Sequence, residues 1–206
     1  MDEIKNMSKW LIPGADVLYA LEVFVHKAAH FGQYGEDAIV ESFFSEKKIQ
    51  DITYLEIGIP SPINLSNTYH FYLNGNKGVC IEANSNAIAD LERVRPRDKI
   101  VSCGVGGTDE EGKQLDFFIM KNHPEINTFS RNTVSFWEAK GYECERVIKV
   151  PVFSLNTILE RYFDKAPEFI SIVIEGYEYQ VLKDLDFTKW QSQCFCIETG
   201  EEQMRI

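Results

Sequence analysis

The chain has 206 residues, of which 44% are hydrophobic and 26% are charged. This composition is typical of a single globular domain and excludes a disordered chain. Asp and Glu number 32 against 21 Lys and Arg, which gives a formal net charge of −11. This acidic balance argues against non-specific binding to nucleic acid or anionic lipid, so we expect no nucleic acid as a partner.

The five cysteines are Cys80, Cys103, Cys144, Cys194 and Cys196. Their number is odd and their spacing fits no zinc site, so we predict neither a disulfide framework nor a metal site. Several of them lie in apolar runs, which indicates reduced thiols and a cytoplasmic location. No run approaches the about 20 apolar residues of a membrane span, so we expect no integral membrane segment.

The N-terminal region shows a helical pattern that begins after Pro13. Apolar residues there recur at steps of three and four positions, which predicts an amphipathic helix over 15–30. We interpret 1–31 as an N-terminal helical extension and 32–206 as the main domain. A second helix, entered from a glycine-marked turn, contains Phe43.

From residue 52 onward, short apolar runs alternate with helical segments. The runs are typical of strands and cover 52–58, 78–83, 99–103, 115–120, 146–153, 169–174 and 194–198. The helical segments cover 66–73 (with Ser66 near the N-cap), 87–94, 155–163 and 177–185. This alternation predicts a parallel sheet covered on both faces, so the fold class is α/β, doubly wound. Ligands of such sheets bind beyond the carboxyl ends of the strands.

Acidic residues stand at the end of three predicted strands, at the expected ligand edge: Glu56, Glu82 and Glu175. The loop 56–62 lacks the glycine pattern of dinucleotide sites, which disfavours an NAD-type oxidoreductase, and it also lacks the P-loop pattern. These features favour a nucleoside cofactor without a phosphate, such as S-adenosylmethionine. A carboxylate at Glu82 is placed to accept hydrogen bonds from both ribose hydroxyls, and acids suit the cationic groups of this cofactor.

Short motifs occur in chain order between about residues 32 and 199. They are Gly32-Gln-Tyr-Gly-Glu-Asp37, Glu56-Ile-Gly-Ile-Pro-Ser-Pro62 followed by Ser66-Asn-Thr68, Cys80-Ile-Glu-Ala-Asn84, Arg95-Pro-Arg-Asp98, Thr128-Phe-Ser130, and Ser171-Ile-Val-Ile-Glu-Gly-Tyr-Glu178 with Val181-Leu-Lys183. Together they resemble the motifs of the FkbM family of S-adenosylmethionine-dependent methyltransferases. The resemblance implies a Rossmann-like class I methyltransferase fold, in which the C-terminal part of the sheet is shortened here.

The resemblance also implies which residues bind S-adenosylmethionine. They are Glu56 and Gly58 beside the methionine part, Ser66 and Asn67 at the carboxylate, Glu82 at the ribose, Ala83, Cys103 and Gly104 around the adenine, and Gln33, Glu36 and Asp37 closing the pocket from the N-terminal side. Glu175 would lie near the methyl group.

Some residues depart from the family pattern. Ile59 and Pro60 replace a small and a polar residue, and Val173 replaces an Asp that would face the methyl group or the acceptor. Alternation along the strand would put Val173 and Glu175 on one face, so that Glu175 would partly compensate. The chain ends shortly after the last predicted strand, and a homodimer is one way to cover the sheet edge.

The predicted reaction is in-line methyl transfer to an acceptor, with a hydroxyl of a small molecule or sugar as the expected acceptor. Removing the hydroxyl proton needs a base whose pKa is near neutral. We select Glu175 and His123 as catalytic candidates, with His70 as a further base. The alternative is a catalytically impaired protein of this fold that binds the cofactor or a protein partner without transferring methyl, which Val173 and Pro60 favour.

Overall fold

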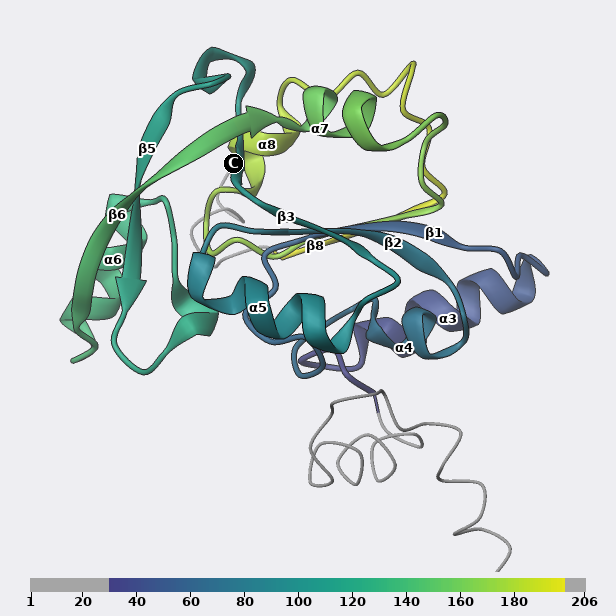
Figure 1. The fold of residues 1–206 in the computed structure, drawn as a ribbon, viewed down its shortest axis with the longest axis horizontal. Coiled ribbons are helices and arrows are strands. Elements are labelled where there is room, and N and C mark those ends of the chain that lie inside the picture. The colour runs from purple at the N-terminus through teal and green to yellow at the C-terminus, as the bar shows by residue number, and fades with distance from the viewer. Residues whose placement is uncertain (1–29, 199–206) are drawn as a thin grey trace, which may run out of the picture.

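The structure is a computed structural model that describes residues 30–198. The helix predicted over 15–30 lies outside the described residues except for its last residue. Most of the predicted extension 1–31 lies outside them as well. The described residues form a central parallel sheet with helices on both faces and a smaller sheet at one end (Figure 1). None of the helices within 30–198 has the length and apolar character that crossing a membrane requires.

The central sheet has five parallel strands in the order β3-β2-β1-β7-β8. Its strands are β1 (Thr53–Ile57), β2 (Lys77–Glu82), β3 (Lys99–Ser102), β7 (Phe169–Ile172) and β8 (Cys194–Ile197). The sequence predicted all of these strands, and each is confirmed. Because β1 lies between β2 and β7, the winding of the chain reverses at β1. In folds of this kind the ligand crevice forms at such a reversal.

Helices cover both faces of the central sheet. They are α3 (Glu36–Glu46), α4 (Tyr69–Leu73) and α5 (Ser85–Val94) on one face, and α7 (Leu155–Tyr162) and α8 (Glu178–Leu182) on the other (Figure 1). Leu55 and Ile57 of β1 pack in one core with residues of α7 and α8. Tyr54 points the opposite way and packs in a second core with residues of α3 and α4. The predicted α/β doubly wound fold is therefore confirmed.

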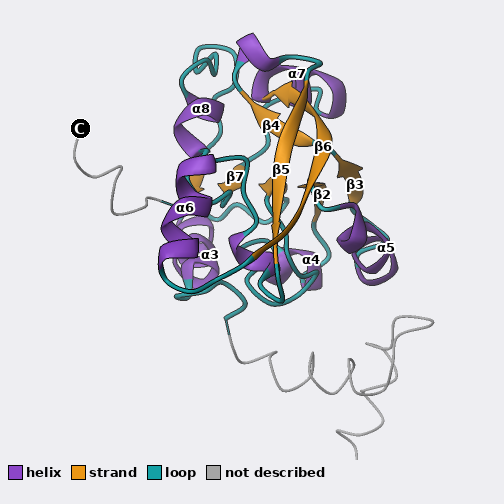
Figure 2. Cartoon of the chain, turned by 90° about the vertical axis from the view of Figure 1, so that its left-hand side faces the viewer, coloured by secondary structure: helices purple, strands orange, loops and turns teal. Residues whose placement is uncertain are grey.

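A second sheet extends from the carboxyl edge of the central sheet. Its strands lie in the order β4-β6-β5, and they are β4 (Gly104–Gly106), β6 (Cys144–Ser154) and β5 (Gln114–Met120). β5 runs antiparallel to β6, and α6 (Arg131–Ala139) lies beside this pair (Figure 2). Short 3₁₀ helices at Thr108–Glu110 and Pro124–Ile126 complete the connections. The sequence predicted β5 and β6, but it did not predict β4 or α6.

The strand predicted over 169–174 is shorter than expected. β7 ends at Ile172, and Glu175 adopts a left-handed backbone conformation with φ of 54°. The side chains of Val173 and Glu175 therefore do not alternate as in a strand, and the expectation that they share one strand face is wrong. Instead, the chain turns sharply at Glu175 on its way into α8.

A buried polar cluster, which we call the Arg95 network, holds the connection between β1 and α4. The fully buried guanidinium of Arg95 pairs with Glu56 at 3.0 Å and with Asp98 at 2.8 Å. It also donates hydrogen bonds to the hydroxyls of Ser66 and Thr68. The Ser66 hydroxyl also accepts from the Tyr69 amide at 3.1 Å. The helix predicted over 66–73 begins at Tyr69, with Thr68 in the N-cap position.

Candidate active site

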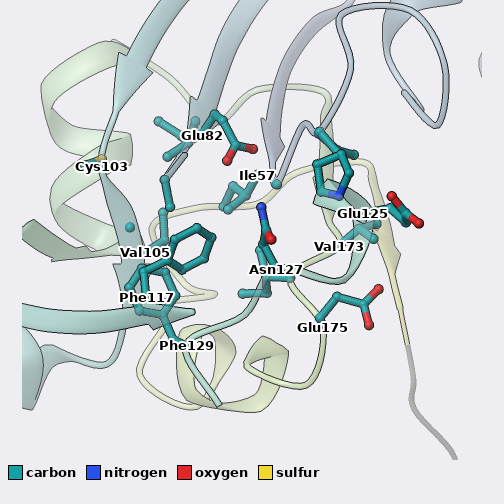
Figure 3. Close-up of a pocket in the computed structure, with 17 residues that line it drawn as sticks. Ile57, Glu82, Cys103, Val105, Phe117, Glu125, Asn127, Phe129, Val173 and Glu175 are labelled. Carbon is teal, nitrogen blue, oxygen red and sulfur yellow. The ribbon is translucent and has the colours of Figure 1, made fainter. Parts of the chain in front are cut away.

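The carboxyl ends of β1 and β2 and the residues after β7 surround a pocket that we call the strand-tip pocket (Figure 3). Its lining consists of Ile57, Gly58, Pro60, Ile81, Glu82, Ala83, Cys103, Gly104, Val105, Phe117, Pro124, Glu125, Asn127, Phe129, Val173, Ile174 and Glu175. The predicted site residues among them are Gly58, Glu82, Ala83, Cys103, Gly104 and Glu175. The pocket therefore lies at the sheet edge where the sequence predicted a ligand.

Gly58 brings the loop after β1 close to the chain that follows β7. Its φ is 84°, and a Cβ at this position would lie 1.9 Å from the carbonyl oxygen of Val173. The Gly58 amide donates to the carbonyl of Ile81 at 3.0 Å, which ties the same loop to β2. Only glycine fits both the backbone conformation and the close approach.

Glu82 presents a buried carboxylate at the tip of β2, where only 6% of the residue is exposed. One of its oxygens accepts from the Ile59 amide at 2.8 Å and the other from the Asn84 amide at 2.6 Å. Burial raises the pKa of Glu82 to about 7, against the opposing effect of these hydrogen bonds. Each carboxylate oxygen has capacity for a further hydrogen bond. Glu82 is thus able to accept from a pair of hydroxyl groups.

Aromatic rings from β5 and from the loop before α6 narrow the other side of the strand-tip pocket. The ring centroids of Phe117 and Phe129 are 4.7 Å apart. Phe129 packs so closely on Gly104 that a Cβ there would lie 2.4 Å from the ring. The remaining space is about 40 Å³, whereas ligand pockets usually have about 300 Å³ or more. The strand-tip pocket as it stands is therefore too small for a nucleoside, and Phe129 on Gly104 is one of the side chains that fill it.

A second cavity of about 530 Å³ adjoins the strand-tip pocket, and we call it the acidic cavity. Its lining consists of Gln33, Tyr34, Glu36, Pro60, Leu65, Asn67, Glu125, Ile126, Trp137, Val173, Glu175, Cys196, Ile197 and Glu198. The residues common to both spaces are Pro60, Glu125, Val173 and Glu175. The structure thus brings four predicted site residues together here: Gln33, Glu36, Asn67 and Glu175.

Glu175 and Glu198 form a pair of interacting carboxyl groups in the acidic cavity. Burial raises the pKa of Glu175 to about 8, and the negative charge of Glu198 adds to this effect. Burial also raises the pKa of Glu198, and the hydrogen bond from Glu175 acts in the opposite direction. Burial therefore disfavours the charged form of both carboxyl groups of the pair.

Three predicted cofactor residues line neither of the two cavities described above. Glu56 and Ser66 belong to the Arg95 network, where Glu56 accepts hydrogen bonds from the Ser66 hydroxyl at 2.9 Å and the Asn67 amide at 2.7 Å. Asp37 is buried and accepts from the Phe31 amide at 2.7 Å. Their contacts fix the loop after β1 and the start of α3.

The histidine candidates also lie outside both cavities. His123 is partly exposed and pairs at 2.9 Å with Glu125, a residue that lines both cavities, but His123 itself lines neither. His70 is on α4 and pairs with Glu41 at 3.0 Å on α3. Neither histidine is placed to contact a ligand in these cavities. Across residues 30–198, no His, Cys, Asp and Glu side chains are grouped as a metal ion would require.

The structure adds lining residues that the sequence did not indicate as site residues. Glu198 follows the last apolar strand, which is the same signal that selected Glu56, Glu82 and Glu175. Asn127 lies between Glu82 and Glu175 in Figure 3, and its side-chain oxygen accepts from the Met120 amide at 2.8 Å. No sequence pattern marked Asn127, because its placement depends on the fold of the second sheet.

Comparison with models of protein families identifies the family of the chain. Residues 41–203 match the methyltransferase FkbM domain. Comparisons with curated proteins and with solved structures find no match. The matched range contains every strand of the central sheet and the tips that form the strand-tip pocket. It supports a methyltransferase function. The chain therefore belongs to the FkbM methyltransferase domain family, as its motifs predicted.

Proposed function

We propose that the protein transfers the methyl group of S-adenosylmethionine to a hydroxyl oxygen of a small molecule or sugar. The observation that carries this proposal is the buried Glu82 carboxylate, which faces the strand-tip pocket beside the close approach at Gly58. A carboxylate at the end of β2 can accept hydrogen bonds from the ribose hydroxyls. Gly58 has no side chain, so a ligand can approach the backbone of the loop after β1. The expected cytoplasmic location and homodimer stay predictions from the sequence.

The residues present fit the adenosine and the methionine portions of this cofactor. Glu82 would accept from the ribose hydroxyls, while Ala83, Cys103 and Gly104 would border the adenine once Phe129 has moved. The loop at Gly58 would lie against the methionine part. The cofactor supplies a methyl group on a positively charged sulfur, which is a good leaving group.

Glu175 is the proposed base for the acceptor hydroxyl. It lines both cavities, so it lies where a cofactor at the strand tips would meet an acceptor in the acidic cavity. Burial and Glu198 raise the pKa of Glu175 to about 8, which is near the value that an efficient general base needs. In its deprotonated form Glu175 would take the hydroxyl proton, and the chain would otherwise align the reactants.

Calorimetric titration of the full chain with S-adenosylmethionine tests the cofactor assignment. We expect binding that Glu82→Ala weakens by about tenfold or more, because lost hydrogen bonds to a charged group are worth about 1.5–3 kcal/mol. Glu92→Ala, on the exposed side of α5, is the control and leaves the affinity unchanged. Thermal melts check that both variants remain folded.

Absence of any binding to the wild-type chain would overturn the cofactor assignment. Unchanged affinity in a folded Glu82→Ala variant would instead show that the ribose does not bind at β2. Methyl transfer to candidate sugars and phenols then tests the reaction itself.

A further inference from the structure

The acidic cavity carries an unbalanced set of negative groups. Glutamates reach it from four separate segments: Glu36 at the start of α3, Glu125 after β5, Glu175 after β7 and Glu198 after β8. Among the described residues that line it there is no Lys, Arg or His. A concave wall of one charge sign attracts ligands of the opposite sign.

Asn67 gives a second, independent indication of a ligand. The residue is 4% exposed and lines the cavity, and its side-chain nitrogen donates to the Ser171 hydroxyl at 3.1 Å. Its side-chain oxygen has no hydrogen-bond partner among the described residues. Buried polar atoms are normally paired, so this oxygen is available to a donor that the described chain does not supply.

The unpaired oxygen lies next to one of the glutamates. A Cβ on Gly32 would be 2.6 Å from the Asn67 oxygen and 2.7 Å from a carboxylate oxygen of Glu36. These two acceptors, together with a carboxylate oxygen of Asp37 at 3.2 Å from the same point, thus gather beside Gly32 at the edge of the cavity lining. Such a group of acceptors suits a ligand atom that carries several N–H donors and a positive charge.

An aromatic side chain completes the wall. Trp137 of α6 lines the same cavity as the four glutamates. Tryptophan is the most favourable aromatic partner for a cation. Lys140 has its ammonium 5.1 Å from the Trp137 ring centroid, but Lys140 does not line the cavity. The lining of the acidic cavity therefore combines carboxylates with an aromatic ring.

The charges in the cavity also disfavour each other in the unliganded chain. Burial and the charge of Glu198 raise the pKa of Glu175, and Glu178 and Glu125 add to the repulsion. A bound cation would reverse this effect by stabilising the carboxylate forms. A neutral ligand would leave the negative charges uncompensated.

We propose that the acidic cavity binds a positively charged nitrogen group of the methyl acceptor. The acceptor would then be an amine-bearing alcohol, phenol or sugar, whose ammonium contacts Asn67 and Glu36 while its hydroxyl faces Glu175. The role of the bound molecule as acceptor rests on the proposed methyl transfer, whereas the binding of a cation does not.

Matched probe pairs test this inference by calorimetry. The pairs are tyramine with tyrosol and glucosamine with glucose, in which an ammonium group replaces a hydroxyl. Each probe is titrated into the full chain, once alone and once with saturating S-adenosylhomocysteine. We expect at least one amine to bind about tenfold or more tightly than its neutral counterpart, since a charged hydrogen bond is worth about 1.5–3 kcal/mol. Glu36→Gln should reduce this preference, and Glu92→Gln should not.

The titrations with and without S-adenosylhomocysteine distinguish a site for the acceptor from a site for the amino group of the cofactor. Retention of the amine preference in the presence of S-adenosylhomocysteine supports an acceptor site. Loss of amine binding in that arm alone would assign the cation site to the amino group of the cofactor and overturn the inference. Equal or weaker binding of both amines would overturn it as well. Failure of S-adenosylhomocysteine to bind would contradict the proposed function, while the titrations without it would still report on the cation site.

Discussion

Two clusters of carboxylates in this molecule differ in how their negative charges are compensated. In the Arg95 network, one guanidinium pairs with Glu56 and Asp98, and both ion pairs are almost completely excluded from water. In the acidic cavity, four glutamates line an open space without a basic side chain among the described lining residues. The first cluster contains its own cation, whereas in the second burial raises the pKa of Glu175 and of Glu198. The comparison distinguishes carboxylates that stabilise the fold, as in the Arg95 network, from carboxylates that we propose bind a ligand, as in the acidic cavity.

The largest expected effect comes from breaking the balanced cluster. Arg95→Met leaves Glu56 and Asp98 buried without their cation, and removing one partner of a buried ion pair costs about 3–5 kcal/mol. Urea denaturation of the variant should show this loss of unfolding free energy. The control is Arg93→Met in the last turn of α5, two residues before Arg95. Arg93 pairs with Asp90 at a partly exposed site, and losing this pair should cost less than about 1 kcal/mol. Equal losses in the two variants would contradict a structural role for the network.

A smaller effect is expected from Gly58, the glycine in the loop after β1 that lines the strand-tip pocket. Gly58→Ala places a methyl group against the Val173 carbonyl in a left-handed backbone, and strain of this kind costs about 1–3 kcal/mol. Cofactor affinity should fall as well, because the loop must move away from β7. Gly75→Ala is the matched control, since its φ is 93° but no described atom lies within 4 Å of the added Cβ. Equal cofactor affinity in the two variants would remove Gly58 from the site.

The smallest expected effect is a shift of the pH profile of methyl transfer. Only deprotonated Glu175 accepts a proton, so kcat/KM should rise with pH through about 8, the pKa to which burial and Glu198 raise this group. Glu198→Gln removes the neighbouring negative charge, which lowers the pKa of Glu175 and moves the rise to lower pH. Glu175→Gln should abolish the rise together with most of the activity. If the pH dependence of kcat/KM is the same in Glu198→Gln as in the wild type, the Glu175–Glu198 pair does not act in catalysis.

The central sheet was predictable because its inner strands β1, β2 and β7 are mostly buried and its edge strands β3 and β8 still contain adjacent apolar residues. Such strands appear as short apolar runs, and all five runs in this sheet were recognised in the sequence. β4 was missed because Gly104–Gly106 has only one side chain, that of Val105, which is too little to form an apolar run. α6 was missed because Val134 is its only buried residue, which leaves little helical periodicity to detect.

The site was predictable only in part, because the end of a strand does not reveal what its side chain meets. Glu56 and Glu82 give the same signal in the sequence, yet Glu56 is paired with Arg95, 39 residues further along the chain. Glu175 and Glu198 follow neighbouring strands, and their pairing depends on the sheet order. Contacts of this kind come from the tertiary fold and not from local patterns.

A crystal structure with S-adenosylhomocysteine tests the central claim most directly. We expect the ribose hydroxyls on Glu82, the amino-acid part beside Gly58, and Phe129 displaced from Gly104. The acidic cavity should remain open beside the sulfur. A ligand bound elsewhere, with Phe117 and Phe129 still filling the space at the strand tips, would contradict the assignment of this pocket to the cofactor.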